Sequence, residues 1–282
     1  MQIAKVFGLM TAMMFLLVAF GSYMGGSSGA ALFFVIGLVM NFGTFWFSDR
    51  AVLRMYRAQV IGPENAPDLY RMVDRLRQNA GLPMPTLAIA PSPQPNAFAT
   101  GRSADKAVVC VTIGLMNLLS TEELEGVIAH ELAHVKHKHM LVATLAAAMA
   151  GAIGLFASII KWGFIFGSGS RDDGRGNPIV LLAMAIVAPI AAMVVQMAIS
   201  RQNEFQADAT AAAIVGNQKG LVSALRRIEH AAQNVPMIVN PAAAHLAIIN
   251  PLSGGHAPPL SGLFRTHPPT EDRVAALNRL SL

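Results

Sequence analysis

The residues with the clearest chemical potential form an H-E-x-x-H pattern, in which Glu131 follows His130 and His134 comes three residues later. Side chains four positions apart lie on the same face of a helix, about one turn along its axis. The two imidazoles can therefore bind one Zn²⁺ ion together, while the neighbouring carboxylate of Glu131 faces a water on the metal. A solvated helix face that carries two histidines is the simpler alternative. Catalytic zinc needs three protein ligands, so a third ligand elsewhere in the chain would favour the metal.

This pattern requires a helix, and the stretch from Ser120 to His139 predicts one. Ser120 and Glu123 have the spacing of a capping box, in which each side chain bonds a free backbone N–H at the start of a helix. Apolar residues then recur at steps of three and four positions and predict a buried stripe. They are Leu124, Val127, Ile128, Leu132 and Val135. We find no stop signal after His139, so we expect the helix to run on into the apolar segment that follows.

The composition indicates an integral membrane protein. Of the 282 residues, 54% are hydrophobic and only 13% are charged, and the mean hydropathy is +0.48. The net charge of +5 is spread along the chain without clusters of basic and aromatic residues, which argues against a nucleic-acid partner and suits contact with anionic lipid. The only cysteine, Cys110, excludes an internal disulfide and a cysteine-rich zinc site, and it is typical of a reducing compartment.

The chain contains four uncharged segments that are long enough to cross a bilayer. Residues 6–48 carry no charge, and the stretch from Gly25 to Gly29 divides them into two spans. A cleaved signal peptide is the alternative, which we disfavour because the apolar segment is longer than a signal core and a second one follows directly. Residues 140–160 and 177–200 predict the third and fourth spans.

The basic residues that flank these spans predict the orientation of the chain in the membrane. One side collects most of them, namely Lys5, Arg50, Arg54, Arg57, Lys136, Lys138 and Arg201. By the positive-inside rule, both termini and the H-E-x-x-H helix are expected in the cytoplasm. We divide the chain into a transmembrane hairpin (1–48), a first soluble part with a sheet and the H-E-x-x-H helix (49–139), a second transmembrane hairpin (140–199) and a second soluble part (200–282).

The soluble parts combine helices with a small sheet. Pro67 and Gly81 bracket a predicted helix, and a short helix is expected to open at Thr270. Further helices are predicted over 201–216 and 221–233, and strands over 86–90, 96–101 and 107–113.

The predicted topology offers a third ligand. Two antiparallel spans bring Arg201 and the residues after it back to the membrane face that the H-E-x-x-H helix leaves. Glu204 lies four residues after the end of one span and His134 about six before the start of another, so their heights above the bilayer agree within a few ångströms. Glu204 would complete a site of two histidines and one glutamate, and Asp208 would accept the spare ring N–H of a ligand histidine. The alternative is an ordinary solvated helix face that pairs with Arg201.

Four stretches of the sequence together resemble one known family. They run from His130 to His134, from Glu204 to Asp208, from Asn96 to Gly101 and from Thr266 to Arg273. The family is the HtpX family of bacterial integral membrane zinc metallopeptidases, which is related to the CAAX prenyl proteases. The resemblance extends over essentially the whole chain, including the four spans in the same order.

This resemblance implies a fold and a function. The expected fold is mainly α with a small β-sheet: four transmembrane helices with a zincin-like (gluzincin) cytoplasmic metalloprotease domain. His130, His134 and Glu204 are the implied ligands of one Zn²⁺ per chain, and Glu131 is the implied catalytic base. The implied function is endopeptidase cleavage of misfolded or damaged membrane proteins, as proteolytic quality control under stress, at the inner membrane of a bacterium.

Two parts of the sequence, a predicted strand and a histidine near the C-terminus, each allow two interpretations. One is the strand that contains Asn96, Ala97, Phe98 and Ala99. It is either an edge strand along which an extended peptide substrate docks or a plain strand and turn. The other feature is His267, before two prolines, which is either an aid to the oxyanion or a turn residue without a catalytic role; we favour the turn.

Two more histidines, His137 and His139, follow the H-E-x-x-H pattern without the spacing of ligands. Because Lys136 and Lys138 lie beside them, we interpret the group as a basic cluster that faces lipid headgroups.

Two other functions compete with a membrane peptidase. A metal transporter is disfavoured because every candidate ligand lies outside the apolar spans, whereas transport sites lie near the middle of the membrane. The other alternative is an inactive membrane scaffold that retains the motif. Measurements of zinc content and of proteolysis would distinguish it from a peptidase.

Overall fold

The computed structural model describes residues 2–151, 200–234 and 268–281. The remainder of the predicted third span, all but the last residue of the fourth span and His267 lie outside the described residues.

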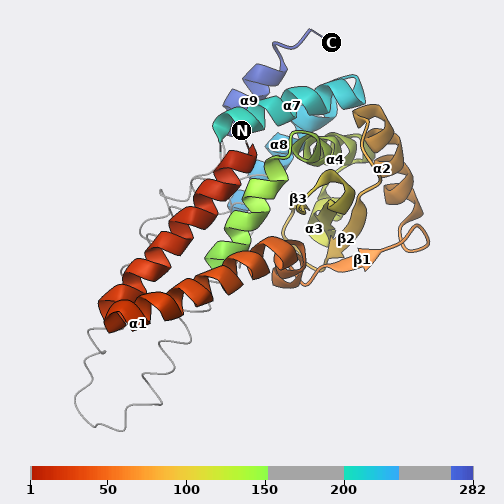
Figure 1. The fold of residues 1–282 in the computed structure, drawn as a ribbon. Coiled ribbons are helices and arrows are strands. Elements are labelled where there is room, and N and C mark those ends of the chain that lie inside the picture. The colour runs from red at the N-terminus through yellow and green to blue at the C-terminus, as the bar shows by residue number, and fades with distance from the viewer. Residues whose placement is uncertain (1, 152–199, 235–267, 282) are drawn as a thin grey trace.

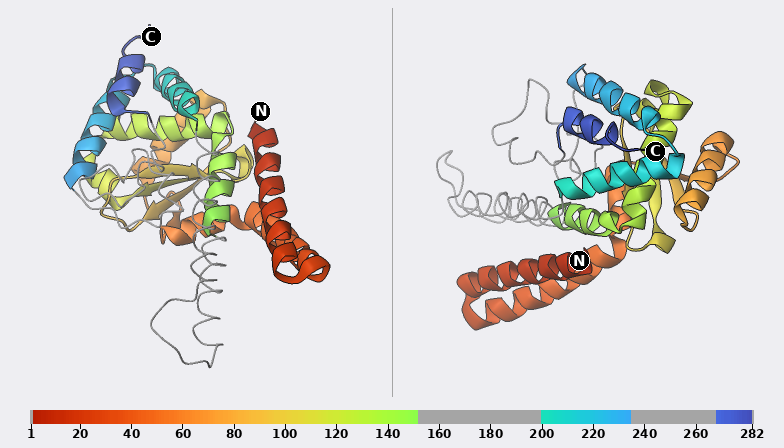
Figure 2. Two further views of the ribbon diagram at one scale, coloured as in Figure 1. Left: turned by 90° about the vertical axis from the view of Figure 1, so that its left-hand side faces the viewer. Right: turned by 90° about the horizontal axis from the view of Figure 1, so that it is seen from above.

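The chain begins with a pair of long apolar helices that together form α1 (Gln2–Met55). They meet at Gly25 and Gly26, whose backbone is not helical; Gly26 has φ +59°, a left-handed conformation that costs glycine little. The two helices, Gln2–Tyr23 and Gly25–Met55, are long and apolar enough to cross a membrane. Figures 1 and 2 show them as a hairpin that projects from the rest of the described chain. The predicted break between two apolar helices near Gly25 is therefore confirmed, and the second helix continues to Met55.

A four-stranded mixed sheet forms the centre of the soluble part. Its strands are β1 (Gln59–Ile61), β2 (Thr86–Ala90), β3 (Ala97–Thr100) and β4 (Val108–Thr112). They lie in the order β1-β2-β4-β3, with β2 and β4 parallel and both outer strands antiparallel to their neighbours. The three predicted strands are confirmed, β2 with the predicted bounds and β3 and β4 each one residue shorter at both ends. The sequence analysis missed β1, because three residues give no alternation that can be recognised.

Helices cover one face of this sheet. They are α2 (Pro67–Ala80), α3 (Ile113–Leu118), α4 (Thr121–Lys136), α7 (Arg201–Val215), α8 (Lys219–Asn234) and α9 (Thr270–Leu277). The main hydrophobic core joins this layer to the sheet through Leu87, Val109, Ile128 and Leu225, each almost fully buried. The other face packs on Val52, from the end of α1, and on Ala147 of the helix His139–Gly151. In Figure 1, α7 and α8 lie beside α4, and α9 lies against α7. The chain is therefore mainly helical with a small mixed sheet, as predicted.

Helix α4 starts as the sequence predicts. The Ser120 hydroxyl accepts a hydrogen bond from the Glu123 N–H, and the Glu123 carboxylate accepts one from the Ser120 N–H, which completes the capping box. The same carboxylate also accepts bonds from the Ser223 hydroxyl at 2.6 Å and from Arg227 at 2.8 Å. Since both partners belong to α8, the cap fixes α4 against its neighbour.

The end of α4 corrects the sequence analysis, which expected one helix to run on past His139. The helix ends at Lys136, and Lys138 adopts a left-handed backbone with φ +61°. A separate helix then begins at His139 and is described as far as Gly151. Periodicity does not reveal this break, because a left-handed conformation is unfavourable for lysine and nothing in the apolar pattern marks it.

Candidate metal centre

Three potential metal ligands meet where α7 packs against α4. His130 and His134 lie one turn apart on α4, and Glu204 lies in the first turn of α7. One ligand atom from each residue lies within 4.8 Å of the others. The Nε2 atoms of the two histidines are 3.0 Å apart, and the Glu204 carboxylate oxygens lie 3.6 Å from His130 Nε2 and 3.5 Å from His134 Nε2. The prediction that Glu204 joins the two histidines is confirmed.

The donor set fits zinc. Two imidazole nitrogens and one carboxylate oxygen are the ligands of many catalytic zinc sites, which keep a fourth position for water or substrate. Two atoms that each lie about 2.0–2.1 Å from a tetrahedral zinc ion are about 3.4 Å apart. The three separations at this site lie on either side of that value.

Small side chains let the two ligand-bearing helices approach each other. Ala129 and Ala133 of α4 are fully buried, and so, to within 1% exposure, are Ala207 and Ala211 of α7. Because alanine adds little width to a helix, the two backbones can pack closely enough for His130 and Glu204 to share one ion. The alanine-rich sequence after Arg201 thus contributes to the metal centre without supplying a ligand.

Asp208 contacts His130 at the ring nitrogen that does not face the other two ligands. Its Oδ1 atom lies 2.9 Å from His130 Nδ1, the ring nitrogen on the far side from Glu204. This position matches the predicted role of Asp208 as the acceptor for a ligand histidine. A carboxylate in this position fixes the ring orientation and leaves Nε2 for the metal.

Arg273 is a site residue that the sequence analysis did not single out. It comes from α9 and is 1% exposed, and its Nε and Nη2 atoms donate to the two oxygens of Asp208 at 2.8 and 2.7 Å. Burial alone would raise the pKa of Asp208, but the charge and hydrogen bonds of Arg273, together with the His130 bond, lower it to about 2. Arg273 belongs to the stretch that carries the family resemblance, so the signal was present, but nothing local assigned it a partner.

Glu131, the predicted catalytic base, lies between α4 and the edge of the sheet. It is 5% exposed, and its Oε2 atom accepts a hydrogen bond of 2.7 Å from the Ala99 N–H. Strand β3 is an outer strand, and Ala99 is paired with Val109 of β4. Since the Ala99 N–H bonds Glu131, it points away from β4, on the side of β3 that pairs with no other described strand. The predicted base and the outer strand are therefore in direct contact. The side chains of β3 are themselves buried.

His139 is placed differently from the prediction. It is 6% exposed rather than directed to solvent or lipid headgroups, and its Nδ1 atom lies 3.1 Å from Nδ1 of His134. His137 is half-buried and bonds the Thr210 hydroxyl of α7 at 2.9 Å. The interpretation of these histidines as a headgroup-facing cluster is wrong for His139. Lys136 and Lys138 are exposed, as expected.

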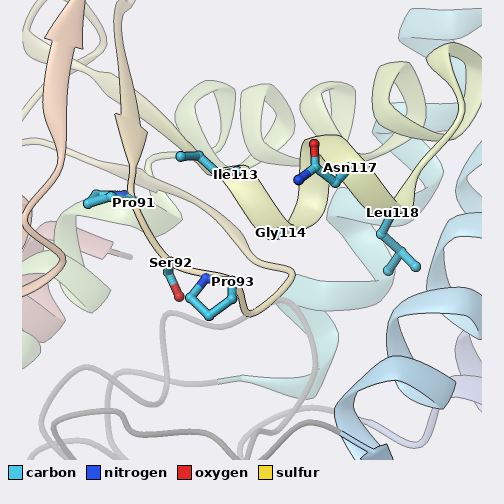
Figure 3. Close-up of a pocket in the computed structure, with 7 residues that line it drawn as sticks. All are labelled: Pro91, Ser92, Pro93, Ile113, Gly114, Asn117 and Leu118. Carbon is cyan, nitrogen blue, oxygen red and sulfur yellow. The ribbon is translucent and has the colours of Figure 1, made fainter.

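A separate hollow of 510 Å³ lies where β2 ends and α3 begins (Figure 3). It is lined by Pro91, Ser92, Pro93, Ile113, Gly114, Asn117 and Leu118. None of these side chains titrates near neutral pH, and none belongs to the metal centre. Gly114 is required here because a Cβ atom at this position would lie 2.0 Å from the Pro93 carbonyl oxygen. The hollow therefore offers shape without acid–base or metal chemistry.

Comparison with known proteins found one matching family model and several relatives that align over nearly the whole chain. The sequence model of peptidase family M48 matches residues 63–281. A protein named "Protease HtpX homolog" from Gemmatimonas aurantiaca is 52% identical over 277 residues, which cover 98% of each chain. A protein with the same name from Pelotomaculum thermopropionicum is 50% identical over 280 residues, 99% of each chain. The crystal structure of S. mikatae Ste24p aligns over 88% of this chain and 64% of its own, with 18% identity and a TM-score of 0.42.

Proposed function

Because the chain belongs to peptidase family M48 and is a zinc metallopeptidase, we propose that it is a membrane endopeptidase that removes misfolded or damaged membrane proteins. Its metal centre lies on helices that are continuous or nearly continuous in sequence with apolar segments. Helix α4 is separated from the helix His139–Gly151 by only two residues, and α7 starts directly after an uncharged segment. Substrates exposed at the membrane surface would therefore reach the site.

We assign the zinc ligands and the base as follows. His130, His134 and Glu204 hold the ion, which when bound acts as a Lewis acid that acidifies water and polarises a peptide carbonyl. Glu131 accepts a proton from the attacking water and passes it to the departing amine. Asp208 keeps the His130 ring in the orientation that presents Nε2 to the ion.

The outer position of β3 supports a docking mode for the substrate. An extended peptide can add to a sheet edge through main-chain hydrogen bonds, and the backbone N–H groups of Ala97 and Ala99, two positions apart, both point away from β4. The bond between the Glu131 carboxylate and the Ala99 N–H supports this docking mode, because the proposed base lies beside β3. A peptide on β3 would therefore run past the group that activates water.

The membrane arrangement in this proposal comprises four spans, with both termini and the metal centre in the cytoplasm of a bacterium. The two apolar helices of α1 and the similarity to the HtpX homologs support a membrane protein. The basic residues around the uncharged segments support the orientation. The proposed divisions at residues 48, 139 and 199 follow from the same segments. Reporter fusions after residues 30, 170 and 282 would test the topology, and an exported C-terminus would contradict it.

The test of the activity uses the full chain purified in detergent. We expect the wild type to contain one zinc ion per chain and to cleave casein. Glu131→Gln should retain zinc and lose activity by at least about 100-fold, because it removes general base catalysis. Glu204→Ala should lose zinc as well. Full proteolysis by the Glu131→Gln variant would remove Glu131 from the base role, and a zinc-free, inactive wild type would favour a scaffold.

A further inference from the structure

The two zinc-binding histidines have different partners on their second ring nitrogens. A ligand histidine needs such a partner, because the bond at one nitrogen fixes the ring orientation and leaves the other nitrogen free to bind metal. For His130 the partner is the Asp208 carboxylate. For His134 the nitrogen at the corresponding position lies 3.1 Å from Nδ1 of His139. The distance is that of a hydrogen bond between two imidazoles.

The contact between His134 and His139 is possible because the helix is interrupted after Lys136. On a continuous helix, His139 would lie about 140° around the axis from His134 and could not reach its ring. Here the His137 N–H bonds the Ala133 carbonyl, the Lys138 N–H bonds the Val135 carbonyl, and the left-handed Lys138 turns the chain back. A left-handed conformation costs a non-glycine residue about 1 kcal/mol. The unfavourable conformation therefore occurs at the residue whose backbone directs His139 towards His134.

We propose that His139 is a positioning residue for zinc: its neutral Nδ1 accepts the Nδ1–H of His134 and directs Nε2 of His134 toward the ion. His139 does not bind the metal or the substrate in this assignment. The inference depends on the zinc site and not on the identity of the substrate.

The position of His139 also connects the ligand to the N-terminal helices. His139 opens the helix His139–Gly151, whose residues Val142, Leu145 and Met149 are buried against α1. Their partners on α1 are Val6, Leu9 and Met13. Because the first residue of this helix bonds His134, the packing of the helix on α1 determines where the second zinc ligand is held.

The test compares three substitutions by their zinc affinity, measured by competition with a chromophoric chelator. His139→Leu keeps the bulk and removes the acceptor, so we expect zinc affinity to fall by about 10- to 100-fold. His139→Asn places an amide oxygen near the Nδ1 position and should restore most of the affinity. His137→Leu is the control: it removes a ring that bonds Thr210 and stacks on His139, but it leaves the His139 acceptor in place, so zinc affinity should stay close to that of the wild type.

Binding of Co²⁺ in place of zinc gives a second readout, because its visible spectrum reports the geometry of the ligands. His139→Leu should alter this spectrum, whereas His139→Asn and His137→Leu should preserve it. Equal losses of zinc affinity in His139→Leu and His137→Leu would overturn the proposal, and so would wild-type affinity in His139→Leu.

Circular dichroism establishes which variants fold. If His139→Leu does not fold, His139→Gln decides, because its longer side chain cannot place an acceptor at the Nδ1 position. A folded His139→Gln variant with wild-type zinc affinity would overturn the proposal, and a loss of affinity that is absent in His139→Asn would support it. A wild type that binds zinc but cleaves no casein would refute the proposed function while leaving these zinc measurements valid.

Discussion

Replacing Arg273 with methionine tests whether the buried ion pair behind His130 supports the metal centre. The substitution keeps an unbranched apolar stem and removes the guanidinium that donates two hydrogen bonds to Asp208. Asp208 is then left as a buried carboxylate, with its side chain 2% exposed and a remaining bond to His130. Removing one partner of a buried pair costs about 3–5 kcal/mol, mostly because the other charge loses its compensation.

We expect the lower end of that range, because the bond from His130 to Asp208 survives. A loss of about 3 kcal/mol corresponds to a fall in Tm of roughly 6–12 °C for a domain of this size. The measurement is thermal unfolding in detergent with zinc present, followed by far-UV circular dichroism. Arg273→Lys should fall between the wild type and Arg273→Met, because an ammonium keeps the charge but cannot reproduce the two parallel bonds.

The double variant Arg273→Met/Asp208→Asn is the decisive control. It removes both charges, so it should be more stable than Arg273→Met alone, although its zinc affinity should fall because the amide is a weaker acceptor for His130. If the Tm of Arg273→Met lay within 2 °C of the wild-type Tm, the loss of stability would be about 1 kcal/mol or less, which would refute the reasoning. Strictly additive losses in the double variant would refute it as well, because residues in direct contact are expected to couple.

Two further predictions concern the elements that position the site. A Cβ atom at Gly126 would lie 2.6 Å from the Leu221 backbone nitrogen, so Gly126→Ala should separate α4 from α8 and destabilise the fold by about 1–3 kcal/mol in thermal unfolding. Gly43→Ala is the control and should destabilise it less, because nothing lies within 4 Å of the added Cβ. Equal Tm values for the two variants would contradict this prediction. Burial opposes ionisation of Glu123, but its bonds from Ser223 and Ser120 and the charge of Arg227 lower its pKa below the ordinary 4.5. Its contribution to stability is therefore present above pH 4.5 and lost as the pH falls through the lowered pKa, so the gap in stability between wild type and Glu123→Gln should narrow in acid denaturation; a gap that widens there would contradict the assignment.

The parts of the site that follow local rules could be predicted from the sequence. The capping box, the apolar stripe of α4 and the pair of histidines depend on spacings within a single helix. Glu204 could also be predicted, although it is distant in sequence, because the predicted spans restrict where the two ligand-bearing helices begin and end. In that case topology supplied the long-range information that spacing alone lacks.

Arg273 and His139 could not be predicted, for two physical reasons. A buried arginine is recognised by its partner, and the contact between Arg273 and Asp208 joins elements 65 residues apart. No period or cap marks such a pair. The contact of His139 depends on a left-handed Lys138, which has no signature in sequence because lysine prefers the helical conformation that it leaves here.

The charges of the buried groups explain why a carboxylate supports one ligand and an imidazole the other. Glu131, Glu204 and Asp208 are each at most 5% exposed, as is Arg273. In their ordinary ionised forms these groups leave two net negative charges, which one Zn²⁺ ion would cancel. An unbalanced charge is costly in a buried site. A second carboxylate behind His134 would add one more buried negative charge, and Arg273, the buried cation among the described residues, already pairs with Asp208. A neutral imidazole at His139 provides the same acceptor without that cost, so the balance of charge favours histidine at this position.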